Sequence, residues 1–552
     1  MKKQVFNPFL PLNVCIPDGE PHLFDGRVYL YGSHDREGGW TFCMEDYEVW
    51  SAPEEDLSDW RCEGITYRAS QDPAYPERKY MYAPDVVRGN DGRYYLYYCM
   101  SGDYGVGGYT QPISVAVCDT PAGKYEFLGH VKNPDGSLMM RYVCFDPAVL
   151  NDNGVIRLYY GTQYGFEEDH PGEEWVLETE QEMFGRTREE ILSYPDSING
   201  PVMAVLEDDM LTVKEPAKHI IPYKVKGTSF EEHPFFEASS MRKMGEKYYF
   251  VYSSWQNHEL CYAVSDHPDR DFSFGGTIVS NGDVGIDGRK IEDKLNMTGT
   301  THGSIIQLSG QWYVFYHRLT HKSDYSRQAC AEKIEIAEDG SIKQVEITSC
   351  GLNDGPLRAE GIYPAGICCN LTNGRMPHGC NSVYPIAFPN ITNLGEERFI
   401  GEIEDGTLIG YKYFECKGLS EIGIKVRYET PENLVTFHGP ARIDERSADE
   451  MKKYEKPENV AEDELKSGED FDEGYFDEGY FDISTSIDGP VIARIAVPLT
   501  EPGVTDASAL DPMTWLDCSG LIDPDTLPDG TYAFFLRYHG KRKTQLREIW
   551  FR

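Results

Sequence analysis

The sequence lacks any uninterrupted apolar run approaching the roughly 18 residues that a membrane-spanning helix requires. It has no CxxC pair, and its 14 cysteines are scattered, so no zinc-binding pattern is present. No apolar segment precedes Pro8 and Pro11 that would serve as a secretory signal. These absences predict a cytoplasmic protein with reduced, buried thiols and no membrane association.

Basic residues are also scarce. The chain has 52 Lys and Arg against 92 Asp and Glu, a formal net charge of −40. Such a charge repels polyanions, which excludes nucleic acid and anionic membrane surfaces as expected partners. The acidity itself indicates solubility and carries no catalytic conclusion.

Long helical patterns are few. The 37 Tyr and 25 Phe lie instead in short aromatic and β-branched runs that Gly, Pro, Asn and Asp interrupt. Such runs are typical of short strands, so we expect an all-β protein. A chain of 552 residues exceeds what one core usually holds, which predicts two domains.

One pattern, a turn glycine followed by a tyrosine-rich strand, occurs five times. The turn glycines are Gly26, Gly92, Gly154, Gly245 and Gly310. Each copy is typical of a hairpin, and repeats of about 60 residues suggest four-stranded blades. The repeat predicts a five-bladed β-propeller over residues 1–350, with a generic β-rich protein as the alternative. The longest spacing marks an insertion at roughly 165–232, either a pocket wall or a plain surface loop.

A polar residue precedes each turn glycine by seven or eight positions. These residues are Asp18, Asp85, Asp146, Glu237 and His302. Any one of them alone would be interpreted as a turn residue. In a propeller, however, equivalent positions of the innermost strands converge on one axis. Four carboxylates and one imidazole together are costly unless they catalyse a reaction or bind a ligand.

Paired carboxyl groups are the usual machinery of glycoside hydrolysis. A protonated carboxyl group donates to the departing oxygen, while an ionised one activates water. A third carboxylate nearby raises the pKa of the acid by repulsion. The residues alone do not say which carboxyl group has which role.

Short motifs in a characteristic order make a more specific case. They are Asn7-Pro8, Ile16 to His22, Tyr29 to Asp35, Tyr82 to Asp85, Phe145 to Ala148, Phe236 to Ser240, His302 to Ser304 and Tyr316 to Arg318. Over roughly residues 7–350, the sequence resembles glycoside hydrolase family 43. This resemblance implies a five-bladed propeller that inverts the anomeric centre.

The resemblance also implies roles for the polar residues. Asp18 matches the general base, Glu237 the general acid, and Asp146 the carboxylate that tunes and orients the acid. His302 matches an axial histidine that binds Ca²⁺ in many members, so Ca²⁺ at the propeller axis is expected, and no organic cofactor. A structural core histidine is the alternative for His302. Asp85, at the equivalent level of the second blade, is interpreted as a structural residue that closes strand ends.

Four further residues are candidates for binding substrate. Arg327 matches an arginine that reaches the active site in family xylosidases, with a salt bridge in the last blade as the alternative. His34 lies in one of the matching motifs. Trp40 and Trp255 are candidate stacking platforms for sugars, although packing within a blade is the favoured interpretation of each.

The stretch Pro17-Asp18-Gly19 departs from the Ala-Asp-Pro of many members. It resembles the β-xylosidase and α-L-arabinofuranosidase branch. We therefore expect an inverting exo-glycosidase that releases terminal pentose from xylo- or arabino-oligosaccharides in xylan degradation, preferentially as a β-xylosidase. An α-L-arabinofuranosidase, a glycoside phosphorylase and a non-catalytic carbohydrate-binding protein stay open. The oligomeric state is not predicted.

The propeller pattern ends near Leu352. Short strand-like segments follow, so residues 351–552 are predicted to form a β-sandwich. Residues 407–414 and 530–536 resemble carbohydrate-binding module family 6. The stretch 444–482 combines acids with a tandem aromatic repeat and is predicted to be a solvated loop.

Overall fold

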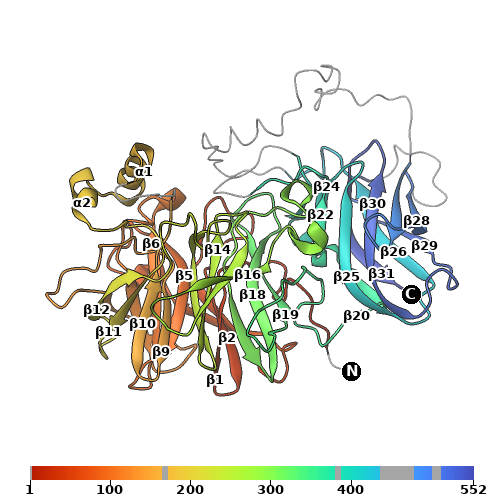
Figure 1. Ribbon diagram of the computed structural model, residues 1–552. Helices are drawn as coiled ribbons and strands as arrows, with labels where there is room; N and C mark the ends of the chain where they lie inside the picture. The colour runs from red at the N-terminus through yellow and green to blue at the C-terminus, as the bar shows by residue number, and fades with distance from the viewer. Residues whose placement is uncertain (1–2, 165–171, 379–386, 436–477, 500–510) are drawn as a thin grey trace.

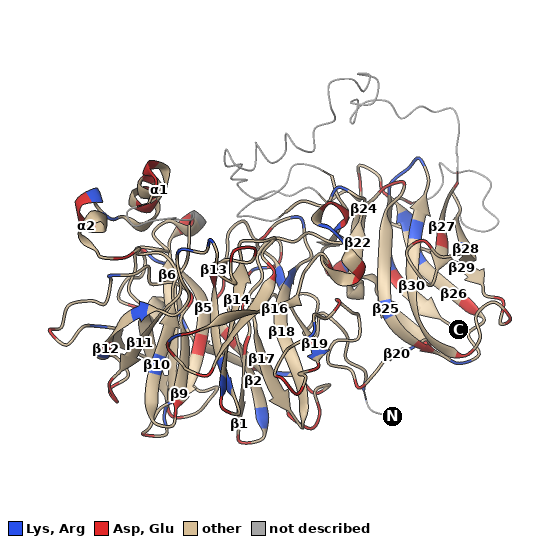
Figure 2. Ribbon diagram, in the orientation of Figure 1, with Lys and Arg blue, Asp and Glu red and all other residues tan. Residues whose placement is uncertain are grey.

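The computed structural model describes residues 3–164, 172–378, 387–435, 478–499 and 511–552 (Figure 1). Strands dominate these ranges, and their two α-helices are α1 (Glu174–Phe184) and α2 (Arg188–Ser193). The expected all-β class is therefore confirmed. Within the described residues, no helix has the length and apolarity needed to cross a membrane. Acidic residues are distributed over the whole described chain rather than in one patch (Figure 2).

The first part of the chain forms five antiparallel sheets whose strands follow one another in sequence. The first sheet contains β1 (Glu20–Phe24), β2 (Arg27–Tyr31), β3 (Tyr47–Pro53) and β4 (Arg61–Tyr67). The second contains β5 (Tyr80–Arg88), β6 (Tyr94–Ser101), β7 (Ser114–Cys118) and β8 (Glu126–His130). The third contains β9 (Ala148–Asp152), β10 (Val155–Tyr160), β11 (Val202–Leu206) and β12 (Val213–His219).

The remaining two sheets of this part complete the series. The fourth contains β13 (Phe235–Met244), β14 (Lys247–Ser254), β15 (Leu260–Ser265) and β16 (Ser273–Val279). The fifth has three strands among the described residues, β17 (Ser304–Leu308), β18 (Gln311–Leu319) and β19 (Arg327–Ile334). Short 3₁₀ turns lie at Ala69–Gln71, Asp103–Gly105, Ile286–Gly288, Ile291–Asp293 and Ala365–Ile367.

The repeated glycines occupy the turn between the first two strands of each sheet. All five have positive φ, from 60° at Gly245 to 92° at Gly154. A left-handed backbone of this kind is inexpensive only for glycine, and it gives hairpins the twist that their strands need. In the first sheet, the pair Phe24↔Arg27 closes directly around this turn. The predicted hairpins are therefore confirmed.

The five sheets close into a ring. The first strand of each sheet contacts the first strand of the next, from β1 through β5, β9 and β13 to β17, and β17 returns to β1. An apolar cluster fills the space between each pair of neighbouring sheets, including the fifth and the first, where Leu30 packs with Phe315. Each fully buried side chain of this kind contributes roughly 1.5–3 kcal/mol. The first strands thus surround one axis.

The second part of the chain contains two six-stranded sheets. One contains β20 (Leu357–Arg358), β22 (Asn370–Thr372), β25 (Leu408–Cys416), β27 (Gly479–Ser484), β28 (Val491–Val497) and β30 (Gly530–His539). The other contains β21 (Gly361–Pro364), β23 (Asn390–Leu394), β24 (Glu397–Ile403), β26 (Glu421–Tyr428), β29 (Leu516–Leu521) and β31 (Thr544–Phe551). Both sheets contribute side chains to one apolar cluster, which includes Phe414 and Leu546.

The insertion contains a capped helix, and the stretch 444–482 ends in a strand. Thr187, within the insertion, caps α2 by accepting the backbone N–H of Glu190. The loop expected at 444–482 lies outside the described residues up to position 477. Its last residues belong instead to β27, where alternating side chains face the core, so that end of the loop prediction is wrong.

Candidate active site

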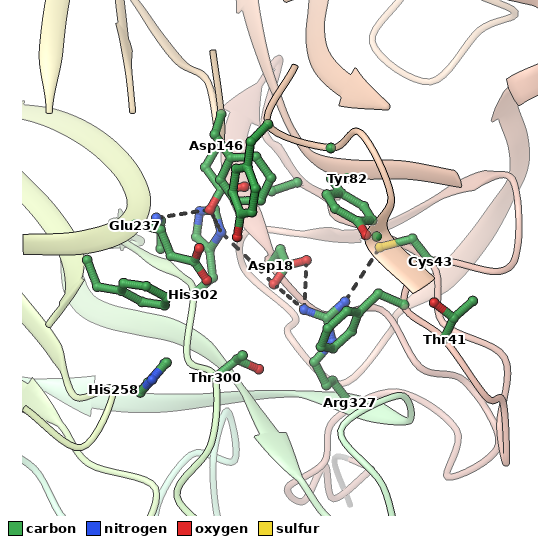
Figure 3. A pocket seen from close by; sticks show the side chains of 18 of the residues that line it. Asp18, Thr41, Cys43, Tyr82, Asp146, Glu237, His258, Thr300, His302 and Arg327 are labelled. Carbon is green, nitrogen blue, oxygen red and sulfur yellow. Dashed lines mark hydrogen bonds and ion pairs between the residues drawn. The ribbon is translucent and has the colours of Figure 1, made fainter. Parts of the chain in front are cut away.

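A cavity of about 730 Å³ opens at the axis of the ring (Figure 3). Each of the five sheets contributes a lining residue from its first strand or from the residues just before that strand. These residues are Asp18, Tyr82, Asp146, Glu237 and His302. Four of them are the polar residues that the repeat predicted to converge.

Asp18 is a buried residue of the cavity wall, and several side chains bind its carboxylate. Its carboxylate accepts hydrogen bonds from Nη1 of Arg327, at 2.9 and 3.1 Å, and from the hydroxyl of Ser33 at 2.6 Å. Burial alone would raise the pKa of Asp18, but the Arg327 charge and the His317 ring outweigh it and hold this pKa well below its usual range. Asp18 is therefore an ionised carboxylate.

Arg327 is fixed by a second carboxylate. Its Nε and Nη2 donate to the two carboxylate oxygens of Asp35 at 2.8 and 3.0 Å, and its guanidinium lies 4.6 Å from the ring centre of Phe42. A bidentate pair of this kind is strong and geometrically specific. The arginine thus carries its charge to Asp18 with little freedom to move.

A strained backbone aims Glu237 into the cavity. The pairing of β13 with β14 shifts register on both sides of Glu237, and the following residue, Ala238, has a φ of 70°. The backbone N–H of Ala238 donates to Oδ2 of Asp146, which itself has a φ of 43°. Bulges and left-handed non-glycine residues are concentrated at functional sites, where they redirect side chains.

The electrostatics separate Glu237 from Asp18. Desolvation and the negative charge of Asp18 raise the pKa of Glu237 to about 8, although Arg327 opposes this rise. Desolvation, together with the charges of Glu237 and Asp18, also raises the pKa of Asp146 well above its usual range. The site therefore holds a protonated carboxyl group beside an ionised one at neutral pH, which is the acid and base pair that glycoside hydrolysis requires.

His302 lies beneath this group of carboxylates. Its Nδ1 is 3.8 Å from Asp146 and 4.0 Å from Asp18, and its Nε2 is 3.8 Å from Oε1 of Glu20. Burial lowers the pKa of His302 to about 4, so the ring is neutral. Both Nε2 of His302 and Oε1 of Glu20 are buried without a hydrogen-bond partner among the described residues.

Asp85 departs from the expected convergence. It is fully buried, accepts a hydrogen bond from the Val149 N–H at 2.7 Å and lies 2.6 Å from Nε2 of His22. A register shift between Tyr82 and Asp85 presents Tyr82 to the cavity instead. Asp85 is therefore not among the described residues that line the cavity, and it ties neighbouring sheets together, which agrees with the structural role expected for it.

The candidate substrate-binding residues divide into two groups. Arg327 lines the cavity, whereas His34, Trp40 and Trp255 are not among the described residues that do so. Nδ1 of His34 lies 2.9 Å from the Asp46 carbonyl oxygen. Trp40 packs edge-on against Tyr80.

Trp255 lies one layer behind the cavity wall. Its Nε1 donates to the Gln163 carbonyl oxygen, and its ring packs against Phe236, which does line the cavity. The insertion supplies part of the wall through Glu182 and Met183 of α1. The pocket-wall interpretation of the insertion is therefore the better one.

Several residues of the site received no role from the sequence. Ser33, Asp35 and His317 lie within the motifs that carried the family resemblance, but nothing in the sequence indicated that they hold Asp18 and Arg327. Glu20 follows Asp18 by two positions, which in a strand places it on the same face. His258 has no local motif, so no sequence signal could have found it.

Comparisons with known proteins identify the family of this chain. The family model described as glycosyl hydrolases family 43 matches residues 7–342. A xylosidase/arabinosidase of Thermoclostridium stercorarium is 46% identical over 448 residues, which cover 77% of this chain and 86% of that protein. Xylosidase/arabinosidase 43A of Humicola insolens is 30% identical over 353 residues, which cover 60% of this chain and 96% of that protein.

Among solved structures, a family 43 β-xylosidase/α-arabinofuranosidase from a compost microbial metagenome, in complex with xylotriose, is 27% identical. It covers 61% of this chain and 96% of that chain, with a TM-score of 0.45. The family match spans more than half of the sequence, and the Thermoclostridium relative extends over most of it. The chain is therefore a glycoside hydrolase and belongs to glycosyl hydrolases family 43.

Proposed function

We propose that this enzyme is an inverting exo-glycosidase that releases terminal pentose from xylo- and arabino-oligosaccharides, with β-xylosidase as its main activity. The supporting observation is the pairing of an ionised Asp18, held by Arg327, with a protonated Glu237 in one cavity. The names of the relatives, which are xylosidases and arabinosidases, support pentosides as the substrate class.

In the proposed mechanism, Asp18 takes a proton from a water molecule that attacks the anomeric carbon. Glu237 donates its proton to the glycosidic oxygen as the bond breaks. The charge of Glu237 raises the pKa of Asp146, so the two carboxyl groups oppose each other's ionisation, and Asp146 anchors the backbone after Glu237 through the Ala238 N–H. Inversion needs room for the water, so we expect roughly 6.5–9.5 Å between the carboxyl groups of Asp18 and Glu237.

We also propose that the five sheets are the blades of a five-bladed β-propeller over residues 1–350, and that the two six-stranded sheets form a β-sandwich over 351–552. The cyclic contacts of the first strands support the former, and the shared apolar cluster supports the latter. The resemblance of the second domain to carbohydrate-binding module family 6 stays a prediction.

The surroundings of His302 fit the expected Ca²⁺. Oε1 of Glu20 and Nε2 of His302 are buried and unpartnered, and Glu20 also lies near Asp85 and His22. Carboxylate oxygens are preferred Ca²⁺ ligands, so Glu20 and Asp85 with His302 would hold the ion, with water completing its coordination. The ion would supply positive charge that offsets these buried carboxylates.

The alternatives are separable. A glycoside phosphorylase needs a cationic phosphate site. Arg327 is the one Lys or Arg among the described residues lining the cavity, and its N–H groups already donate to Asp18 and Asp35. A carbohydrate-binding protein without turnover would not need a base and an acid with opposite pKa shifts. An α-L-arabinofuranosidase would share the whole site, and only substrates distinguish it.

The test is a panel of nitrophenyl pentosides and hexosides, measured with and without phosphate and with and without a chelator. We expect the highest kcat/KM on the β-xyloside, no dependence on phosphate, and α-xylose as the first product seen by NMR. Turnover that requires phosphate, or β-xylose as the first product, would refute the proposal. Activity confined to the α-L-arabinofuranoside would select the alternative hydrolase.

A further inference from the structure

The cavity wall beside Glu237 carries a histidine that the proposed mechanism does not use. His258 lies in the turn between β14 and β15, is only 6% exposed and lines the cavity. Its Nδ1 is enclosed by protein atoms without a hydrogen-bond partner among the described residues, whereas Nε2 is not enclosed in this way. Nε2 is therefore the ring nitrogen that a ligand in the cavity can reach, whereas Nδ1 is closed to it.

Hydrogen bonds and a carboxylate–histidine contact hold the turn that carries His258 in place. Asn257 and His258 have φ values of 57° and 50°, an uncommon conformation for two consecutive non-glycine residues. The backbone of Glu259 bonds to Ser254 and Gln256 at 2.9 and 3.2 Å, which closes the turn. The Glu259 carboxylate lies 3.1 Å from Nδ1 of His233, which ties the turn to the segment before β13. Positive φ at both central residues is the geometry of a type I′ hairpin turn, so the turn holds His258 in a defined position.

Two aromatic contacts fix the orientation of the ring. Phe236 meets it edge-on at 4.8 Å, and His378, from the segment after β22, lies at 4.9 Å. Nδ1 of His378 is in turn 2.7 Å from the hydroxyl of Thr298. Burial lowers the pKa of His258 well below its usual value, so the ring is neutral and carries one proton. Because an enclosed N–H without an acceptor is rarely tolerated, that proton belongs on Nε2, the nitrogen left open to the cavity.

The position of His258 identifies the sugar that it meets. In Figure 3, Asp18 and Arg327 lie to the right of Glu237, and His258 lies below Glu237 at the left, across the cavity from Arg327. In an inverting reaction, the base and its water act on one face of the reacting sugar, and the acid acts on the side of the departing group. The side of Glu237 that faces away from Asp18 is therefore the side on which the departing sugar lies.

We propose that Nε2 of His258 donates a hydrogen bond to a hydroxyl group of the leaving-group sugar. This inference rests on the proposed function, because it presupposes an oligosaccharide substrate cleaved between Asp18 and Glu237. The contact exists only when the departing group is a sugar. It makes His258 a substrate-binding residue that favours short oligosaccharides over aryl glycosides.

The test compares β-1,4-linked xylobiose with 4-nitrophenyl β-xyloside, which has no sugar in the departing position. For His258→Asn we expect kcat/KM on xylobiose to fall about three- to tenfold, as for loss of one neutral hydrogen bond. On the aryl xyloside the change should stay below about twofold. Asn tolerates the left-handed backbone but is too short to reach the position of Nε2. Gln places its amide nitrogen near that position, so His258→Gln should recover at least half of the lost activity.

Gln256→Ala, an exposed position in the same turn, is the matched control and should leave both substrates unchanged. Thermal melting of each variant separates loss of contact from loss of fold. If His258→Asn lowers kcat/KM equally on both substrates, or does not lower it on xylobiose, the proposed role of His258 is overturned. If the unaltered enzyme cleaves neither substrate, the proposed function itself fails, which is a separate result.

Discussion

The backbone N–H of Asp18 donates a hydrogen bond to Nδ1 of His317 at 3.2 Å, across the junction between the first and fifth sheets. Nε2 of the same ring lies 3.0 Å from the Thr300 carbonyl oxygen, and Nδ1 also lies 3.2 Å from Oδ1 of Asp18. Asp18 has a φ of 57°, so this bond helps to hold a strained residue at the point where the ring of sheets closes. The contact that joins the first and fifth sheets therefore also positions the proposed base.

Replacing Arg327 with Met tests how Asp18 stays ionised. Arg327 lowers the pKa of Asp18 against the opposing effect of burial, so its loss raises that pKa. The proposed base must be ionised, so the acid limb of the kcat/KM profile should move to higher pH and the plateau should fall by at least about 100-fold. Arg327→Lys keeps the charge but not the bidentate pair with Asp35, so its acid limb should lie between those of the unaltered enzyme and Arg327→Met. An unmoved acid limb in Arg327→Met would contradict this account.

The pKa of Glu237 predicts the alkaline side of the pH profile. The proposed acid must be protonated, and its pKa is raised to about 8, so kcat/KM should decline as the pH rises through about 8. Glu237→Gln should abolish this decline. It should lose at least 100-fold on xylobiose but much less on an aryl xyloside whose leaving group needs no proton. Equal losses on both substrates would argue against the acid role, whereas Asp18→Ala should lose nearly all activity on both.

Asp146 offers a finer test, because Asn has the same shape and also accepts positive φ. Asp146 and Glu237 repel each other when both are ionised, so Asp146→Asn should lower the pKa of Glu237. The alkaline limb should then move to lower pH while the acid limb stays in place. We expect kcat to fall about 10- to 100-fold. A pH-rate profile with both limbs unchanged would show that Asp146 does not tune the acid.

The sequence allowed much of this site to be predicted, for a physical reason. A repeated turn glycine marks equivalent positions, so the residues at matched distances before it, such as Asp146 and Glu237, had to converge. Asp85 does not line the cavity because a local register shift in β5 presents Tyr82 there instead, and such shifts leave no trace in spacing. Trp255 packs behind the cavity wall, which is the kind of role that the sequence favoured for it over sugar stacking. The position of His258 at the cavity could not be predicted from the sequence, because it depends on the conformation of one turn.

Lys412 provides a prediction about the contact between the two parts of the chain. Its ammonium group, from β25, is buried between Asp283 at 3.1 Å and Glu346 at 2.9 Å. Removing one partner of a buried ion pair leaves an uncompensated charge, at a cost of about 3–5 kcal/mol. Lys412→Met should therefore lower the melting temperature by several degrees, while kcat/KM of the folded enzyme stays within about twofold. The double variant Lys412→Met with Asp283→Asn should regain part of the loss, because the stranded charge is gone. A single variant that melts like the unaltered enzyme would show that this pair does not stabilise the contact.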